Sequence, residues 1–151
     1  MGMLETNVYG TPAPKGSYNA VRNRAGRQVF LPASRREPVW RAQVAAAIRG
    51  AWIRTHAGQP LPHHDGPIGY EAIYYMPRPK TIRRLLPTVP PDLDKITRST
   101  WDGITDSGLI ADDSRITIIG LCAKVYADRR QPGAWIRVSW GDDMPGIGVG
   151  D

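Results

Sequence analysis

The proline-rich segment at residues 78–91, RPKTIRRLLPTVPP, limits the fold of this chain more than any other feature. Proline has no backbone N–H and a fixed φ, so this segment is a poor candidate for a helix or an inner strand. Its basic side chains favour contact with solvent, and we expect a semi-extended, mobile loop here. The regular elements must therefore lie on either side of residues 78–91.

Three strands are predicted from local composition and alternation. Residues 3–9 predict an opening strand, and residues 10–27 a long loop rich in Gly, Pro and Arg. Residues 57–67 are a linker, whereas residues 68–77 favour a strand because β-branched and aromatic side chains dominate them. The segment AWIRVSW, residues 134–140, alternates apolar and other side chains and predicts the last strand.

A first helix is indicated between residues 34 and 56. Ser34 with Glu37 three residues later forms a capping box, and Pro38 fits the first turn of the helix. Apolar residues then recur at helical spacing to about His56: Trp40, Val44, Ala47, Ile48, Ala51 and Trp52. The sequence therefore predicts an amphipathic helix with a basic outer face.

A second helix is predicted directly after the proline-rich segment. Pro91 disfavours helix before it, Asp92 or Asp94 can cap the helix, and Gly108 is placed to end it. The buried stripe of this helix consists of Ile96, Trp101 and Ile104.

The strand that follows shows a change of phase. Ile116 and Ile118 share one face of a regular strand. One residue must be inserted near Ile119 and Gly120 before the next apolar residues share a face; these are Leu121, Ala123 and Val125. The sequence therefore predicts a β-bulge at this point.

A chain of 151 residues is about the size of one domain. We expect an α/β protein with one mixed β-sheet flanked by two main helices over residues 1–140, and a flexible tail at residues 141–151. No apolar run approaches the length of a membrane span and the N-terminus does not resemble a leader, so we expect no membrane contact and a cytoplasmic location. The single cysteine, Cys122, excludes an internal disulfide and a zinc site of several thiolates.

Charge is divided unevenly along the chain. Residues 1–91 carry 13 Lys/Arg and 4 Asp/Glu, a net charge of +9, whereas residues 92–151 carry 7 and 10, a net charge of −3. A basic half joined to an acidic half suits a protein that binds a polyanion with one part and cations with the other. A merely solvated basic surface is the alternative.

Four acidic residues, Asp92, Asp94, Asp112 and Asp113, flank the second helix and the start of the next strand, where the backbone could bring both pairs together. Carboxylates of this kind bind hard cations such as Mg²⁺ or Mn²⁺. The alternative is that the first pair only caps the helix and the second only lies in a turn. Two further residues on the helix, Asp102 and Asp106, are too far along it to share an ion with Asp94 and are interpreted as structural or solvated.

The order of motifs resembles a known family. PDLDKI at 91–96 is followed by WDGI at 101–104, GLI at 108–110 and DDSRI at 112–116, with Lys124 and Tyr126 in the next strand. This arrangement is similar to the RusA-type Holliday junction resolvases, which are common in bacteriophages and prophages. MPRPK at 76–80 and PAPKGS at 12–17 look like the strand end and the DNA-contacting N-terminal loop of that family. The likeness covers most of residues 10–140.

The resemblance implies a RusA-like fold and a metal-dependent endodeoxyribonuclease that acts as a homodimer, each active site nicking one strand of a four-way DNA junction. It implies that Asp92, Asp94 and Asp113 bind Mg²⁺, with Mn²⁺ as the alternative ion, and are needed for cleavage. DNA contacts are expected from Lys15, Ser17, Arg22, Arg78, Lys80, Arg83, Arg84 and Lys124.

Three departures from the family pattern concern the candidate site. Arg98 stands where the family has a functional Lys, four residues after Asp94 and so on the same face of the helix. Arginine keeps the charge but does not release a proton at neutral pH, so we assign Arg98 to the catalytic set as a fixed cation. Lys95 replaces the usual Asn, and Pro90 replaces a basic residue often found there.

Other interpretations remain open at this point. The chain could be a non-catalytic or weakly catalytic DNA-binding protein of the same fold, acting in phage replication or packaging. Asp92-x-Asp94 also resembles the nucleophile motif of haloacid-dehalogenase-like phosphatases, but PTVPP precedes it instead of a buried apolar strand. Lesser candidates are the metal ligands His63, His64 and Asp65, the metal ligand Glu71, and the base-stacking side chains Trp135 and Trp140.

Overall fold

Side chains along the first strand alternate between a buried and an exposed face, so one face of this strand is covered and the other is open to solvent. The computed structural model describes residues 2–16, 18–32 and 35–146, and the side chains of residues 18–22 and 29–32 are not described. Within these ranges the chain forms one α/β domain, a four-stranded mixed sheet with two helices packed together. The expected fold class is confirmed at this level.

The sheet has the strand order β1-β6-β4-β5. β1 (Met3–Tyr9) pairs antiparallel with β6 (Gly133–Ser139), and β6 pairs antiparallel with β4 (Ile68–Met76). β5 (Ile116–Tyr126) pairs parallel with β4 and is the last strand on that side. A parallel pair requires a crossover connection, which is supplied by the second helix.

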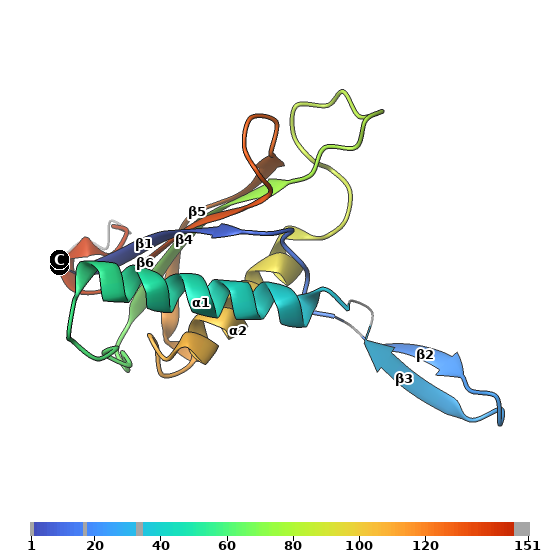
Figure 1. The fold of residues 1–151 in the computed structure, drawn as a ribbon, viewed down its shortest axis with the longest axis horizontal. Helices are drawn as coiled ribbons and strands as arrows, with labels where there is room; N and C mark the ends of the chain where they lie inside the picture. The colour runs from blue at the N-terminus through green and yellow to red at the C-terminus, as the bar shows by residue number, and fades with distance from the viewer. Residues whose placement is uncertain (1, 17, 33–34, 147–151) are drawn as a thin grey trace.

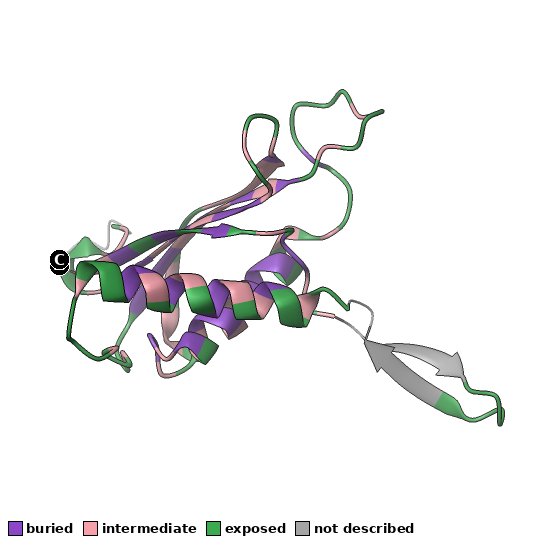
Figure 2. Ribbon diagram, in the orientation of Figure 1, coloured by how far each residue is buried: buried purple, intermediate pink, exposed green. Residues whose placement is uncertain are grey.

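Both helices cover the same face of the sheet (Figure 1). α1 (Glu37–Thr55) and α2 (Leu93–Ser107) also pack against each other. They come into close contact at Gly103, where an added Cβ would lie 2.8 Å from the Val44 Cβ and 3.0 Å from the Arg41 carbonyl oxygen. The core consists of residues from both helices and from the sheet, and Figure 2 shows buried residues on α1, α2 and the strands.

A polar network crosses this core and joins both helices to β4. Trp40 Nε1 and the Tyr74 hydroxyl both donate to Thr100 Oγ1, at 3.1 and 3.0 Å, and the hydroxyls of Tyr70 and Tyr74 lie 2.5 Å apart. Burial raises the pKa of Tyr74 to about 12 and that of Tyr70 well above its ordinary value. Both phenols therefore stay neutral, and each buried polar group of the network has a partner.

The predicted helices are confirmed, with a difference at the start of the first. α1 begins at Glu37 with Arg36 at the N-cap position, so Glu37 is not at the third position of a capping box. Ser34 lies outside the described residues. Pro38 is in the first turn, and α1 ends at Thr55. α2 ends at Gly108, whose φ of 89° is the left-handed conformation that favours glycine.

The predicted loop at residues 10–27 is wrong in its second half. β2 (Tyr18–Arg22) and β3 (Gln28–Pro32) pair antiparallel and form a hairpin that extends away from the sheet (Figure 1). Asn23 organises its turn, because Asn23 Oδ1 accepts from the backbone N–H groups of Ala25 and Arg27. We name this hairpin, residues 18–32, the arm.

The predicted bulge in β5 is confirmed. Tyr70 pairs with Ile119 and Ala72 with Cys122, so one residue of β4 opposes two residues of β5. A second irregularity, which the sequence did not indicate, lies between Ile116 and Ile118. These two residues pair with consecutive residues of β4 and therefore face opposite sides, contrary to the prediction.

The segments without helix or strand also have defined contacts. Residues 77–92, all of them described, contain neither element, as the prolines predicted. At the C-terminal end, the Gly2 N–H donates to Asp143 Oδ2 at 2.8 Å, which attaches part of the expected tail to the start of β1. Within the described residues, no helix has the length and apolar character needed to cross a membrane.

Candidate functional site

Asp92 and Asp94 lie at the N-terminal end of α2, on the surface. Asp92 occupies the N-cap position, and its side chain makes no capping hydrogen bond to the described backbone. Both side chains are more than half exposed, 57% for Asp92 and 63% for Asp94. The helix dipole favours negative charge at this end. Two carboxylates are thus held in one helical turn and left open to a ligand.

Each of these carboxylates has a basic neighbour on the same helix. Lys95 Nζ lies 3.8 Å from Asp92 Oδ2, and Arg98 Nη2 lies 3.8 Å from Asp94 Oδ2. Such exposed pairs contribute little to stability, about 0 to 1 kcal/mol each. The two cations are therefore available to a phosphate without a large cost to the fold.

The N-terminal segment before the arm is fixed beside α2. Lys15 N–H donates to the Lys95 carbonyl at 2.9 Å, and Ser99 Oγ donates to the Ala13 carbonyl. The Lys15 ammonium lies 3.1 Å from Asp102 Oδ2. The backbone of Lys15 thus lies beside the first turns of α2, whereas its ammonium is held at Asp102, about two turns beyond Asp94.

Lys124 connects the far end of β5 to the segment that leads into α2. Its Nζ donates to the carbonyl oxygens of Val89 and Pro91, both at 3.0 Å. Lys124 therefore positions the residue immediately before Asp92. This places the aspartate pair level with the C-terminal part of β5.

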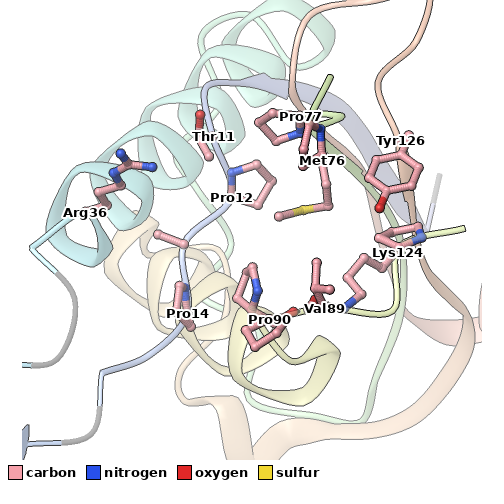
Figure 3. Close-up of a pocket in the computed structure, with 14 residues that line it drawn as sticks. Thr11, Pro12, Pro14, Arg36, Met76, Pro77, Val89, Pro90, Lys124 and Tyr126 are labelled. Atoms are coloured by element: carbon pink, nitrogen blue, oxygen red, sulfur yellow. Dashed lines mark hydrogen bonds between the residues drawn. The ribbon is translucent and has the colours of Figure 1, made fainter. Parts of the chain in front are cut away.

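A cavity of about 460 Å³ opens next to this segment. Prolines from residues 11–14, 76–79 and 87–91 line it, together with Met76, Lys124 and Tyr126. Figure 3 shows the Met76 side chain pointing into the cavity and Lys124 at its side. A mostly apolar cavity of this kind suits a flat base or a sugar better than a phosphate.

Asp112 and Asp113 do not meet the first pair within one chain. They precede β5, in and before the short 3-10 helix η1 (Asp113–Arg115), whereas Asp92 is level with its far end. The eight residues from Ile116 to Lys124 span about 26 Å, and α2 itself, 15 residues long, about 22 Å. Figure 1 shows α2 and β5 running between these two ends of the domain.

Asp112 has a local role at its own end. It caps η1 by accepting from the Ser114 N–H at 3.0 Å. Hydrogen bonds from the Ser114 side chain and backbone lower the pKa of Asp112. The Asp112 carboxylate is thus engaged in a turn, which agrees for this residue with the alternative drawn from the sequence.

A single chain does not supply the three-carboxylate metal site that the resemblance implies. Among the described residues, no three His, Cys, Asp or Glu side chains are grouped so that they could hold one ion. Asp92 and Asp94 are two suitable oxygen donors. The third, Asp113, is too distant in the same chain.

The proline-rich loop differs along its length in how its basic residues are used. Arg78 is tied to the fold: its Nε donates to Asp128 Oδ1 at 2.6 Å, and its guanidinium lies over the Tyr126 ring, 4.1 Å from the centroid. Lys80, Arg83 and Arg84 are exposed. Arg78 thus has a structural role, while the other three are placed where DNA can reach them.

The arm adds basic residues that the sequence analysis did not single out. Arg24 and Arg27 are exposed near its turn. Arg22 lies in β2, but its side chain is not described, and Ser17 lies outside the described residues. The signal for the arm was present, since Asn23 and Gly26 are turn residues between two runs with β-branched or aromatic residues.

The lesser candidates take part in the fold. Glu71 Oε1 accepts from Leu121 N–H at the bulge, and Glu71 Oε2 lies 3.3 Å from Arg137 Nη1. The His64 ring packs on Trp140, with centroids 4.1 Å apart. Trp135 lies under Arg137, 5.2 Å from the ring centroid. These contacts give each residue a structural role.

Comparison with known proteins adds no relative: no protein-family model matches the chain, and no curated protein has significant sequence similarity to it. The likeness to RusA-type resolvases thus depends on the motifs alone.

Proposed function

We propose that this protein is a structure-specific endodeoxyribonuclease of the RusA type, which nicks four-way DNA junctions in the presence of Mg²⁺ or Mn²⁺. Its partners are branched DNA and a second copy of the chain, and its location is the cytoplasm. Two things support this function: the motif resemblance and the geometry at the start of α2.

One observation carries the proposal: two open carboxylates and two exposed cations share the first turns of one helix. Asp92 and Asp94 lie beside Lys95 and Arg98 on α2. Lysine and arginine side chains bind and orient a phosphodiester backbone. Carboxylates in the midst of them are costly for binding DNA alone, so their presence favours a role in chemistry.

The residues of one chain suggest a division of roles during hydrolysis. Water adds to phosphorus and one P–O bond breaks, so negative charge accumulates on the phosphate oxygens. Arg98, one turn after Asp94, is placed to stabilise that charge. Lys95 holds the neighbouring DNA backbone, and the exposed basic residues Lys80, Arg83 and Arg84 extend the contact along the DNA.

A nicking assay on a synthetic immobile four-way junction tests this function. Wild-type protein should nick the junction when Mg²⁺ is added and stop when the ion is chelated. Asp94→Asn should lose at least about 10²-fold in rate while it binds the junction as tightly or more tightly, because one charge that repels phosphate is removed. Asp106→Asn is the matched control on the same helix and should nick normally, since Asp106 pairs with Arg41. Equal losses of binding and cleavage in Asp94→Asn would contradict the proposal.

A second function is favoured by two observations. Asp92 and Asp94 each have a basic neighbour, and the third carboxylate is distant in the same chain. Both facts suit a protein of this fold that binds branched DNA without cutting it. Tight, salt-sensitive junction binding with no Mg²⁺-dependent nicking would establish this alternative.

A further inference from the structure

The cavity beside the proline-rich loop has no part in the chemistry proposed for the start of α2. Three of its lining residues, Ala13, Met76 and Tyr126, belong to the core and are between 1% and 8% exposed. Val89, which also lines it, is 46% exposed. Its volume of about 460 Å³ falls within the range of cavities that bind small ligands, roughly 300–1,000 Å³. The cavity is therefore deep enough to enclose a flat ring and open enough to admit one.

Hydrogen bonds hold the loop that forms one wall of this cavity. Arg78 donates to the carbonyl oxygens of Ile82 and Arg84, at 3.2 and 2.7 Å. Lys124 donates to the carbonyl oxygens of Val89 and Pro91, both at 3.0 Å. The prolines of this wall have a fixed φ, so little conformational freedom is left for a ligand to remove. The cavity is thus preorganised for binding.

The chemistry inside the cavity suits a ring with an apolar face and a polar edge. Its prolines and Met76, which points into it in Figure 3, offer apolar area to the face of a ring. The Lys124 ammonium has three N–H donors and gives two of them to carbonyl oxygens, so one is left for a ligand. Every nucleobase has a flat face and hydrogen-bond acceptors on its edge. A base therefore uses both kinds of surface.

The charge of the walls favours a nucleotide over an acidic or neutral ring. Residues 11–15 and 76–91, which supply most of the lining, contain five Lys/Arg and no Asp or Glu. Two of the five are paired, Lys15 with Asp102 and Arg78 with Asp128. The other three have no ion pair with a carboxylate of the described residues and are exposed; they are Lys80, Arg83 and Arg84. Phosphates on either side of a bound base would meet these cations.

We propose that this cavity binds an unstacked nucleobase of the DNA strand whose phosphate lies at Asp92 and Asp94. Pro91 lines the cavity and immediately precedes Asp92, so the base and the phosphate can belong to adjoining nucleotides. The inference rests on the proposed function for the position of the phosphate and adds the place where a neighbouring base is held. A branch point supplies such a base readily, because unstacking costs least where pairing is already broken.

A fluorescent base tests this inference without any cleavage. The base 2-aminopurine, which brightens when it leaves the stack, is placed in turn at each position around the branch point of a four-way junction. The full-length protein is added in the presence of a chelator, so that no strand is cut. The emission should rise at one position next to the branch point and stay unchanged at positions in the arms.

Two variants fill the cavity from opposite walls. Val89→Trp and Thr11→Trp replace exposed lining residues and should leave the circular dichroism unchanged. Both should abolish the rise in emission and weaken junction binding by about 5-fold or more, since one base loses its contacts. Leu85→Trp is the matched control, because Leu85 lies on the same loop, is 83% exposed and does not line the cavity. It should keep both the rise and the affinity.

The outcomes separate the inference from the proposed function. Emission that stays low at every position, as expected if the cavity binds an acidic peptide instead, overturns the inference even when the protein nicks junctions. A rise that persists in folded Val89→Trp and Thr11→Trp overturns it as well, because the base is then held elsewhere. A rise that both variants abolish, in a protein that never nicks with Mg²⁺, supports the base cavity and overturns the nuclease function.

Discussion

The two ends of α2 are built in opposite ways. At its C-terminal end, Arg49 donates to the carbonyls of Asp106 and Ser107, at 2.7 and 3.2 Å, and Arg41 pairs with the Asp106 carboxylate. At its N-terminal end, Asp92 caps no described backbone group, and the nearest ion pairs are 3.8 Å long. At one end, arginines of α1 pair with the last carbonyls and a carboxylate of α2, while the other end leaves carboxylates and cations exposed. On the proposed function, this contrast predicts that substitutions at the C-terminal end lower stability and that substitutions at the N-terminal end lower activity.

Replacing Arg98 should give the largest effect and tests the difference between the two ends of α2 most strongly. Arg98→Ala should lower the single-turnover cleavage rate by roughly 10²-fold with little change in junction affinity, because it removes a charge needed mainly in the transition state. Its unfolding free energy should hardly change, since the pair with Asp94 is exposed. Arg98→Lys should keep most activity. Cleavage by Arg98→Ala at the wild-type rate would make Arg98 an ordinary surface charge.

Gly103 tests whether the middle of α2 serves stability alone. Gly103→Ala gains helix propensity but forces the new Cβ against Val44 and the Arg41 carbonyl, so we expect a net loss of about 1 to 2 kcal/mol in chemical denaturation. Gly50→Ala on α1 meets only the flexible end of Arg54 and should be neutral or stabilising. An equal gain in both variants would show that the helices are not in close contact at Gly103.

In the proposed function, the loop that leads into α2 extends the DNA contact beyond the start of that helix. Removing Lys80 and Arg83 together should flatten the dependence of log affinity on log salt by up to about two units, because two phosphate contacts and their counterions are lost. Fluorescence anisotropy at several salt concentrations measures this slope. An unchanged slope would place the DNA elsewhere, for instance along the arm with Arg24 and Arg27.

The smallest effect is expected at the C-terminal end of α2. Arg49→Met removes the hydrogen bonds to two helix carbonyls and should lower the unfolding free energy by about 1 kcal/mol. The cleavage rate at a temperature well below unfolding should not change. A loss of cleavage without a loss of stability would contradict the division between the two ends.

The helices and most strands could be predicted because their signals are local. The spacing of apolar residues predicted α1, and Pro91 and Gly108 predicted where α2 begins and ends. The arm was missed because Gly, Pro and Arg dominate the composition of its surroundings. The position of Asp113 could not be read locally: it depends on the parallel crossover from β4 through α2 to β5, which carries the chain to the opposite end of the sheet.

The cleavage of an immobile four-way junction, compared with that of its separate linear arms under the same Mg²⁺ and salt, tests the central claim most directly. The account predicts paired nicks near the branch point of the junction and little or no cutting of the arms. Asp94→Asn should cut neither substrate. Equal cutting of the junction and the linear arms would contradict structure-specific action, and cutting by Asp94→Asn at the wild-type rate would contradict the site at the start of α2.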